Sequence, residues 1–300
     1  MRRKTMMGLM VALTLALALG AAPVATMAKP VRAPSVPAAI FTDPPIDAAH
    51  PPRMEVLHIP SGGVEINGVA YLAAGAGPHP TVILLHGLPG NEKNLDLAQA
   101  IRRAGWNVVT FNYRGSWGSP GAYSFRGNLA DAKAVLAYVR TPANAARLGV
   151  ETRKLVIAGH SLGGGVTAVT AGGDPGLAGA VMISSADLGV MSRTPPGARL
   201  RTARENMESL AGVTAESMAE EMGTLGDASF AAAAPGLMKM PVLVLTSDDG
   251  LAPMSDALVA DLRKRGDKQL SAVHEATDHG WSGKRVALEA LVIAWLQGLK

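Results

Sequence analysis

Short apolar runs recur along most of this chain, and segments of helical periodicity lie between them. The runs cover residues 81–85, 107–111, 154–158, 177–183, 241–246 and 269–274. Runs this apolar are typical of strands that are buried on both faces, as in a parallel sheet. Their alternation with helices predicts an α/β fold, a mostly parallel sheet with helices on both faces.

Two further strands precede these runs. Residues 54–59 and 64–72 are candidate strands on either side of a Ser61-Gly62-Gly63 turn, which predicts a hairpin at one edge of the sheet. One helix is expected to begin at Asn128 as N-cap, with Asp131 three residues later, and the last helix near Ser282.

Residues 187–237 interrupt the alternation. They show helical spacing without a strand, and about fifty residues is long for a simple connection. The segment is therefore expected to be a helical insertion between two parts of one core, 54–186 and 238–300. An insertion at this place is expected to form a lid over a site, and the alternative is a bundle that only packs on the core.

The first 28 residues have the order of an export signal. Arg2, Arg3 and Lys4 precede an apolar stretch, and small residues lead up to Ala28. The expectation is cleavage after Ala28, with Ala22 as the second choice, and a periplasmic or secreted protein with no stable membrane span afterwards. The alternative is a retained anchor helix. Residues 29–53 are proline-rich and predict an extended linker or a surface strap.

Charge and cysteine content exclude several classes of function. The chain has 28 basic and 24 acidic residues, and removal of three basic residues with the signal leaves 25 against 24. A mature charge of +1 without a Lys/Arg cluster gives no reason to expect a nucleic-acid partner. The absence of cysteine excludes disulfides, a thiolate nucleophile and a cysteine zinc site.

Residues 156–165, VIAGHSLGGG, place Ser161 between a buried strand and a helix. A turn this sharp brings Gly159 and Gly163 together, where side chains would clash, and it exposes the serine beside the N-terminus of the helix. A glycine-rich turn can also bind phosphate, but the nucleotide-binding spacing G-x-G-x-x-G is not met and no P-loop lysine follows.

The G-x-S-x-G turn in this setting resembles the nucleophile elbow of the α/β-hydrolase family, over roughly residues 54–300. The resemblance implies Ser161 as nucleophile and His279, in TDHGW after the last strand, as its base. In the family the acid is an aspartate followed four residues later by a proline, and this spacing selects Asp249, which precedes Pro253. Asp248 stays open as an alternative, and Asp187 is a more distant one.

Two loops complete the resemblance. HGLPG, residues 86–90, matches the family's oxyanion loop, which implies the backbone N–H groups of Leu88 and Leu162 as donors. His86 is expected to order this loop. The glycine-rich loop 112–121 resembles a loop of the family that implies a structural role for Arg114, which would tie loops together. His86, Trp117 and Tyr123 are the candidate pocket residues.

The predicted function is that of a serine hydrolase for carboxylic esters of small or medium acyl groups, without cofactor or metal. Amide cleavage of the prolyl-oligopeptidase type is the second chemistry that the HGLPG and arginine loops suggest. Two further alternatives stay open. One is a non-catalytic binding protein that keeps the fold, and the other is a cofactor-free peroxidase that uses the same serine, histidine and aspartate.

Overall fold

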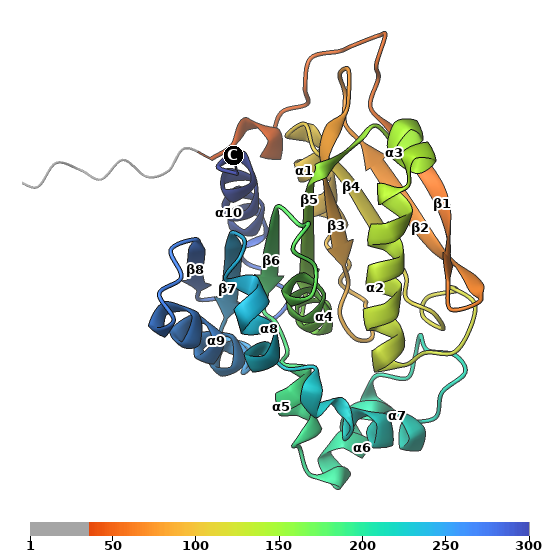
Figure 1. The fold of residues 1–300 in the computed structure, drawn as a ribbon, viewed down its shortest axis with the longest axis vertical. Coiled ribbons are helices and arrows are strands. Elements are labelled where there is room, and N and C mark those ends of the chain that lie inside the picture. Colours follow the sequence, from red (N-terminus) through yellow and green to blue (C-terminus); the bar gives the residue numbers. More distant parts are fainter. Residues whose placement is uncertain (1–35, 300) are drawn as a thin grey trace, which may run out of the picture. The chain divides into compact units, whose positions relative to one another are not determined.

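An eight-stranded sheet runs through residues 36–299, the part of the chain that this computed structural model describes (Figure 1). Its order is β1-β2-β4-β3-β5-β6-β7-β8, and β2 is antiparallel to both of its neighbours. The strands are β1 (Arg53–Ser61), β2 (Val64–Leu72), β3 (His79–Leu85), β4 (Asn107–Phe111), β5 (Val150–His160), β6 (Gly179–Ile183), β7 (Val242–Ser247) and β8 (Leu270–Glu275). From β4 to β8 all pairings are parallel, which confirms the predicted mostly parallel α/β sheet with an edge hairpin.

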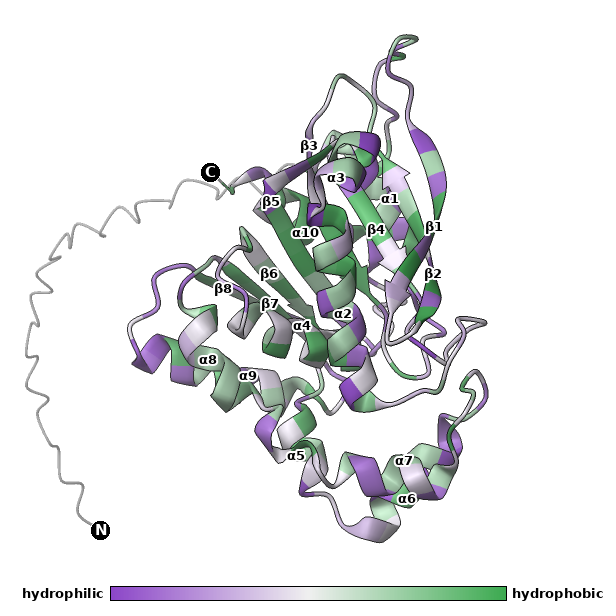
Figure 2. Cartoon of the chain, turned by 45° about the vertical axis from the view of Figure 1, so that its right-hand side comes forward, coloured by the Kyte–Doolittle hydropathy of each residue, from purple (hydrophilic) through white to green (hydrophobic). Residues whose placement is uncertain are grey.

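Helices cover both faces of this sheet. One face packs on α2 (Phe125–Arg140), α4 (Leu162–Gly172), α8 (Phe230–Leu237) and α9 (Ala252–Lys264), with α3 (Pro142–Leu148) beside α2. The other face packs on α1 (Leu95–Arg103) and α10 (Arg285–Gln297). The central strands are apolar on both sides because helices cover both of their faces (Figure 2).

The start of α2 differs from the prediction. Asn128 is not the N-cap, because α2 begins at Phe125 and the Ser124 hydroxyl accepts the Gly127 N–H at 2.9 Å. The Asp131 carboxylate is fully buried and accepts both the backbone N–H and the Nε–H of Arg114, at 2.8 and 2.7 Å. Arg114 thus ties the 112–121 loop to α2. At the other end of the chain, α10 begins at Arg285 rather than near Ser282.

The expected insertion 187–237 is helical, but it divides into two parts. Helices α5 (Leu188–Ser192), α6 (Pro196–Glu205) and α7 (Ala215–Met222) share a small apolar cluster beyond the end of the sheet (Figure 1). Helix α8 instead belongs to the main core. A Cβ on Gly236 would lie 1.8 Å from the Gly172 carbonyl oxygen, so α8 and α4 pack backbone to backbone. The separate part therefore ends before α8, earlier than expected.

Residues 38–40 of the proline-rich segment lie against α1. Arg103 donates from Nε to the Ala39 carbonyl at 2.5 Å and from Nη2 to the Ile40 carbonyl at 3.0 Å. These bonds hold residues 38–40 as a strap on the surface. The expected signal, residues 1–28, lies outside the described residues. Within residues 36–299, none of the helices combines the length and apolar character that crossing a membrane requires.

Candidate active site

Ser161 occupies a strained turn between β5 and α4. Its backbone has φ 59° and ψ −122°, which a non-glycine residue rarely adopts. A Cβ on Gly159 would lie 2.1 Å from the Gly163 carbonyl oxygen, and a Cβ on Gly163 would lie 2.5 Å from that of Leu85. The Ser161 N–H donates to the Ile183 carbonyl on β6 at 2.9 Å. The two glycines therefore allow β5 to turn directly into α4 with the serine at the turn.

His279 and Asp249 form a close pair. His279 Nδ1 lies 2.6 Å from Asp249 Oδ2, and the Asp249 side chain is 1% exposed against 41% for His279. Burial alone would raise the pKa of Asp249, but the hydrogen bonds from His279 and from the Leu251 N–H outweigh it and lower that pKa. An ionised Asp249 accepts the proton of Nδ1, which leaves Nε2 of a neutral ring as the basic nitrogen.

The other two acidic candidates face different partners. Asp248, the immediate neighbour of Asp249, is exposed and lies 3.1 Å from His274 Nε2. Asp187 caps α5 by accepting the Gly189 N–H at 2.8 Å, and it also accepts the Phe230 N–H. Of the three carboxylates, Asp249 is the one that contacts His279.

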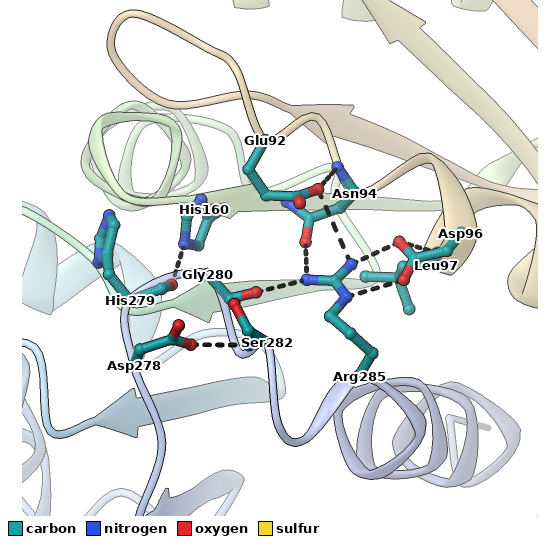
Figure 3. Close-up of polar contacts among 10 residues, drawn as sticks. All are labelled: Glu92, Asn94, Asp96, Leu97, His160, Asp278, His279, Gly280, Ser282 and Arg285. Carbon is teal, nitrogen blue, oxygen red and sulfur yellow. Dashed lines mark hydrogen bonds and ion pairs between the residues drawn. The ribbon is translucent and has the colours of Figure 1, made fainter.

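His160 links the loop that carries His279 to the turn that carries Ser161. Its ring centroid lies 4.6 Å from that of His279, and its Nε2 donates to the His279 carbonyl at 2.8 Å. His160 precedes Ser161 directly, so this bond holds the backbone of His279 next to the turn (Figure 3). Among residues 36–299, the Ser161 hydroxyl itself makes no hydrogen bond to His279 in this structure.

Arg285 fixes the same loop from the other side, and the sequence did not point to it. Its guanidinium donates to Asp96, to Asn94 Oδ1 at 3.1 Å and to the Gly280 carbonyl at 3.0 Å (Figure 3). It thereby joins the loop that carries His279 to the start of α1. No motif identified this arginine because its side-chain partners, Asn94 and Asp96, are distant in sequence.

Two buried hydroxyls, those of Ser184 and Ser247, connect Trp281 to the strand end that precedes Asp249. Trp281 Nε1 donates to Ser184 Oγ at 3.0 Å, and Ser184 Oγ lies 2.7 Å from Ser247 Oγ. An indole N–H can only donate, so Ser184 Oγ accepts from Trp281, and either hydroxyl can donate between Ser184 and Ser247. Ser247 also helps to lower the pKa of Asp249. These residues were also missed in the sequence, where single serines carry no signal.

The HGLPG loop lies against the serine. A Cβ on Gly87 would come within 2.8 Å of Ser161 Cβ, so glycine is needed for this approach. Neither the Leu88 nor the Leu162 N–H donates a hydrogen bond to another residue of the described chain. His86 is buried, and its Nδ1 donates to the Gly87 carbonyl at 2.8 Å. This bond orders the loop, in keeping with the role expected for His86.

The two aromatic candidates, Trp117 and Tyr123, make structural contacts around the site. Trp117, 37% exposed, donates from Nε1 to the Pro89 carbonyl at 2.6 Å, and its backbone N–H donates to the Ser209 carbonyl at 3.0 Å. It therefore joins the HGLPG loop to the insertion. Tyr123 is 4% exposed and packs in the small cluster under the insertion, where its hydroxyl accepts from Asn128 Nδ2 at 3.1 Å.

Two buried histidines make stability depend on pH. Burial, the largest influence on each, lowers the pKa of His86 and of His160 from 6.5 to about 4. Between those pH values the unfolded chain binds protons that the folded chain excludes, so stability is lost as pH falls below 6.5. At pH 5 the loss is about 2 kcal/mol for each histidine.

We therefore expect the free energy of urea unfolding to fall between pH 7.5 and pH 5, and to fall less in His160→Gln. Glutamine can still donate to the His279 carbonyl but does not titrate. The matched control is His58→Gln at an exposed position, which should keep the wild-type pH dependence. An unchanged pH dependence in His160→Gln would show that His160 is not excluded from protonation in the fold.

The described residues include no group of three or more His, Asp or Glu side chains that could hold a metal ion. The geometry instead brings together a serine turn, a histidine–aspartate pair and a glycine loop at the carboxyl ends of parallel strands. That edge is where open α/β sheets carry their sites.

Comparison with known proteins agrees with this architecture. The family described as alpha/beta hydrolase fold matches residues 80–278, which include Ser161 and Asp249 and end one residue before His279. Lysophosphatidylserine lipase ABHD12 of Danio rerio is 36% identical over 91 residues, which cover 29% of this chain and only 22% of that protein.

Two solved structures share the fold at lower identity. An esterase from Pyrobaculum calidifontis has a TM-score of 0.62 at 22% identity and covers 84% of this chain and 88% of its own. EstE1, a carboxylesterase cloned from a metagenomic library, has a TM-score of 0.61 at 24% identity and covers 88% and 92%. Because the family match spans residues 80–278 and the sheet has the same architecture, the chain belongs to the alpha/beta hydrolase family.

Proposed function

We propose that this protein is a serine hydrolase that cleaves carboxylic esters of small or medium acyl groups through an acyl-enzyme. One observation carries the proposal: His279 pairs with Asp249, and it lies on a loop that His160 anchors to the turn holding Ser161. A buried, ionised carboxylate paired with a partly exposed imidazole is the arrangement that makes a neighbouring hydroxyl nucleophilic.

In the proposed reaction, His279 Nε2 takes the hydroxyl proton as Ser161 Oγ attacks the ester carbonyl carbon. Asp249 holds the Nδ1–H tautomer and stabilises the imidazolium that forms. The N–H groups of Leu88 and Leu162 bind the oxyanion, and they are available because they donate to no other described residue. His279 returns the proton to the leaving alcohol. Water then releases the acid by the same steps.

The packing of the insertion favours a substrate site with apolar walls. Leu88 and Leu162 pack with the cluster that α5, α6 and α7 form, in which Met218 and Met222 are buried. Ser209 of the insertion donates to the Pro89 carbonyl at 3.2 Å, beside the proposed oxyanion donors. We propose that the insertion acts as a lid for an apolar acyl group. The esterases and the lipase named above support an ester substrate.

A fluorophosphonate probe tests the proposal, because it labels only an activated serine. The expected result is stoichiometric labelling of the wild-type protein and none of Ser161→Ala, with His279→Ala labelled at least about a thousandfold more slowly. A panel of p-nitrophenyl esters and p-nitroanilides then separates ester from amide cleavage. A folded wild-type protein that stays unlabelled would overturn the proposal and favour a binding role.

A further inference from the structure

A pocket separate from the serine turn lies behind the HGLPG loop, on the face of the sheet that carries α1. It has a volume of about 260 Å³. Side chains from β2, β3 and β4 form its floor, chiefly Val69, Leu84 and Thr110, and Val56 and Leu95 stand at its mouth. Val56 is 70% exposed and Leu95 43%, so this apolar furrow opens to solvent. Neither Ser161, Asp249 nor His279 lines it.

One end of the furrow is polar and carries an uncompensated positive charge. Lys93 Nζ donates to Asn112 Oδ1 at 2.9 Å and lies 4.5 Å from the centre of the Trp117 ring. No carboxylate in residues 36–299 forms an ion pair with it, although the neighbouring Glu92 pairs with Arg285. Burial lowers the pKa of Lys93, which is the effect expected of an ammonium group without an anionic partner.

We propose that this furrow is a binding site for a medium-chain carboxylate, with its head at Lys93 and its alkyl chain along Val69 and Leu84. A half-buried ammonium group favours an anion, and the apolar side chains of the floor favour an alkyl chain. The volume lies just below the range of roughly 300–1,000 Å³ that drug-sized ligands occupy, which suits a chain of medium length. An anion with a polar body would leave the floor unused.

The source of this ligand rests on the proposed function. Hydrolysis of an ester of a medium acyl group releases such an acid, so the furrow would hold the product of the site next to it. Trp117 connects the two sites, because it lies under Lys93 and donates to the Pro89 carbonyl of the HGLPG loop. Product bound at Lys93 would therefore touch the residue that braces the proposed oxyanion loop.

Calorimetric titration of the Ser161→Ala protein with octanoate tests the site without any turnover. The expected result is saturable one-to-one binding that Lys93→Met weakens by about tenfold or more, while Lys93→Arg keeps most of it. Octanol, which lacks the charge, should bind weakly and equally to both proteins. Lys239→Met removes an exposed lysine elsewhere and is the matched control, expected to leave octanoate binding unchanged.

Leu95→Glu provides a second variant if Lys93→Met disturbs the loop. It places a carboxylate at the exposed mouth of the furrow and should weaken octanoate binding by a similar factor. Wild-type protein whose Ser161 carries a phosphonate adduct should still bind octanoate. Unchanged binding in Lys93→Met and Leu95→Glu, or loss of binding on phosphonylation, would overturn the proposal. Failure of the proposed hydrolase function would appear separately, as absence of labelling.

Discussion

Replacing Ser161 by alanine is expected to lower kcat for a p-nitrophenyl ester by about 10⁶-fold, the size of effect seen when a hydrolase loses its nucleophile. The reason is that the acyl-enzyme cannot form without the hydroxyl, and only the oxyanion donors and substrate binding remain. The measurement is the steady-state rate at pH 8, together with the burst of p-nitrophenol that reports acylation in the wild type.

This experiment needs a check that the variant is folded and a matched serine-to-alanine control. Alanine at φ 59° is strained as serine is, so urea unfolding should show a protein of similar stability. Ser271→Ala, at an exposed position on β8, should keep full activity. Activity retained in Ser161→Ala within tenfold of the wild type would remove the serine from the mechanism.

Asp249→Asn is expected to lower kcat by about 10⁴-fold, while Asp248→Asn should change it by less than about threefold. The Asp249 carboxylate is buried and 2.6 Å from His279 Nδ1, so an amide there can present a donor and favour the wrong tautomer. Asp248 is exposed and faces His274, so its charge is screened by water.

The two variants carry the same Asp-to-Asn substitution at neighbouring positions, which makes them matched controls for each other. Both rates are measured at saturating substrate and pH 8. Equal losses in the two variants, or a larger loss in Asp248→Asn, would contradict the assignment of Asp249 as the acid that orients His279.

The alternation of strands and helices was readable from the sequence, because most of the apolar runs of five to seven residues correspond to strands buried on both faces. The run 269–274 is the exception, because it forms the edge strand β8, in which no residue is buried. The serine turn was readable for the same local reason. Glycine stands at 159 and 163 since no side chain fits there, and the structure shows both close contacts. Such features depend on neighbours within a few residues, so the sequence carries them.

Helix ends and domain edges were less readable. Asn128 and Ser124 are both good capping residues, and in the structure Ser124 caps α2 while Asp131 lies within the helix and binds Arg114. In the same way α8 looked like part of the insertion until its glycine contact with α4 placed it in the main core. Propensity alone does not distinguish such alternatives.

The sequence by itself determined the class of fold, the serine turn and the order of the candidate residues, since each follows from local sterics or from burial. Only the tertiary structure decided which of two adjacent aspartates contacts His279, and it also revealed Arg285, Trp281 and the Lys93 furrow. The physical reason is that these contacts join segments up to about two hundred residues apart. Their geometry exists only after the strands have paired and the loops at the sheet edge have met.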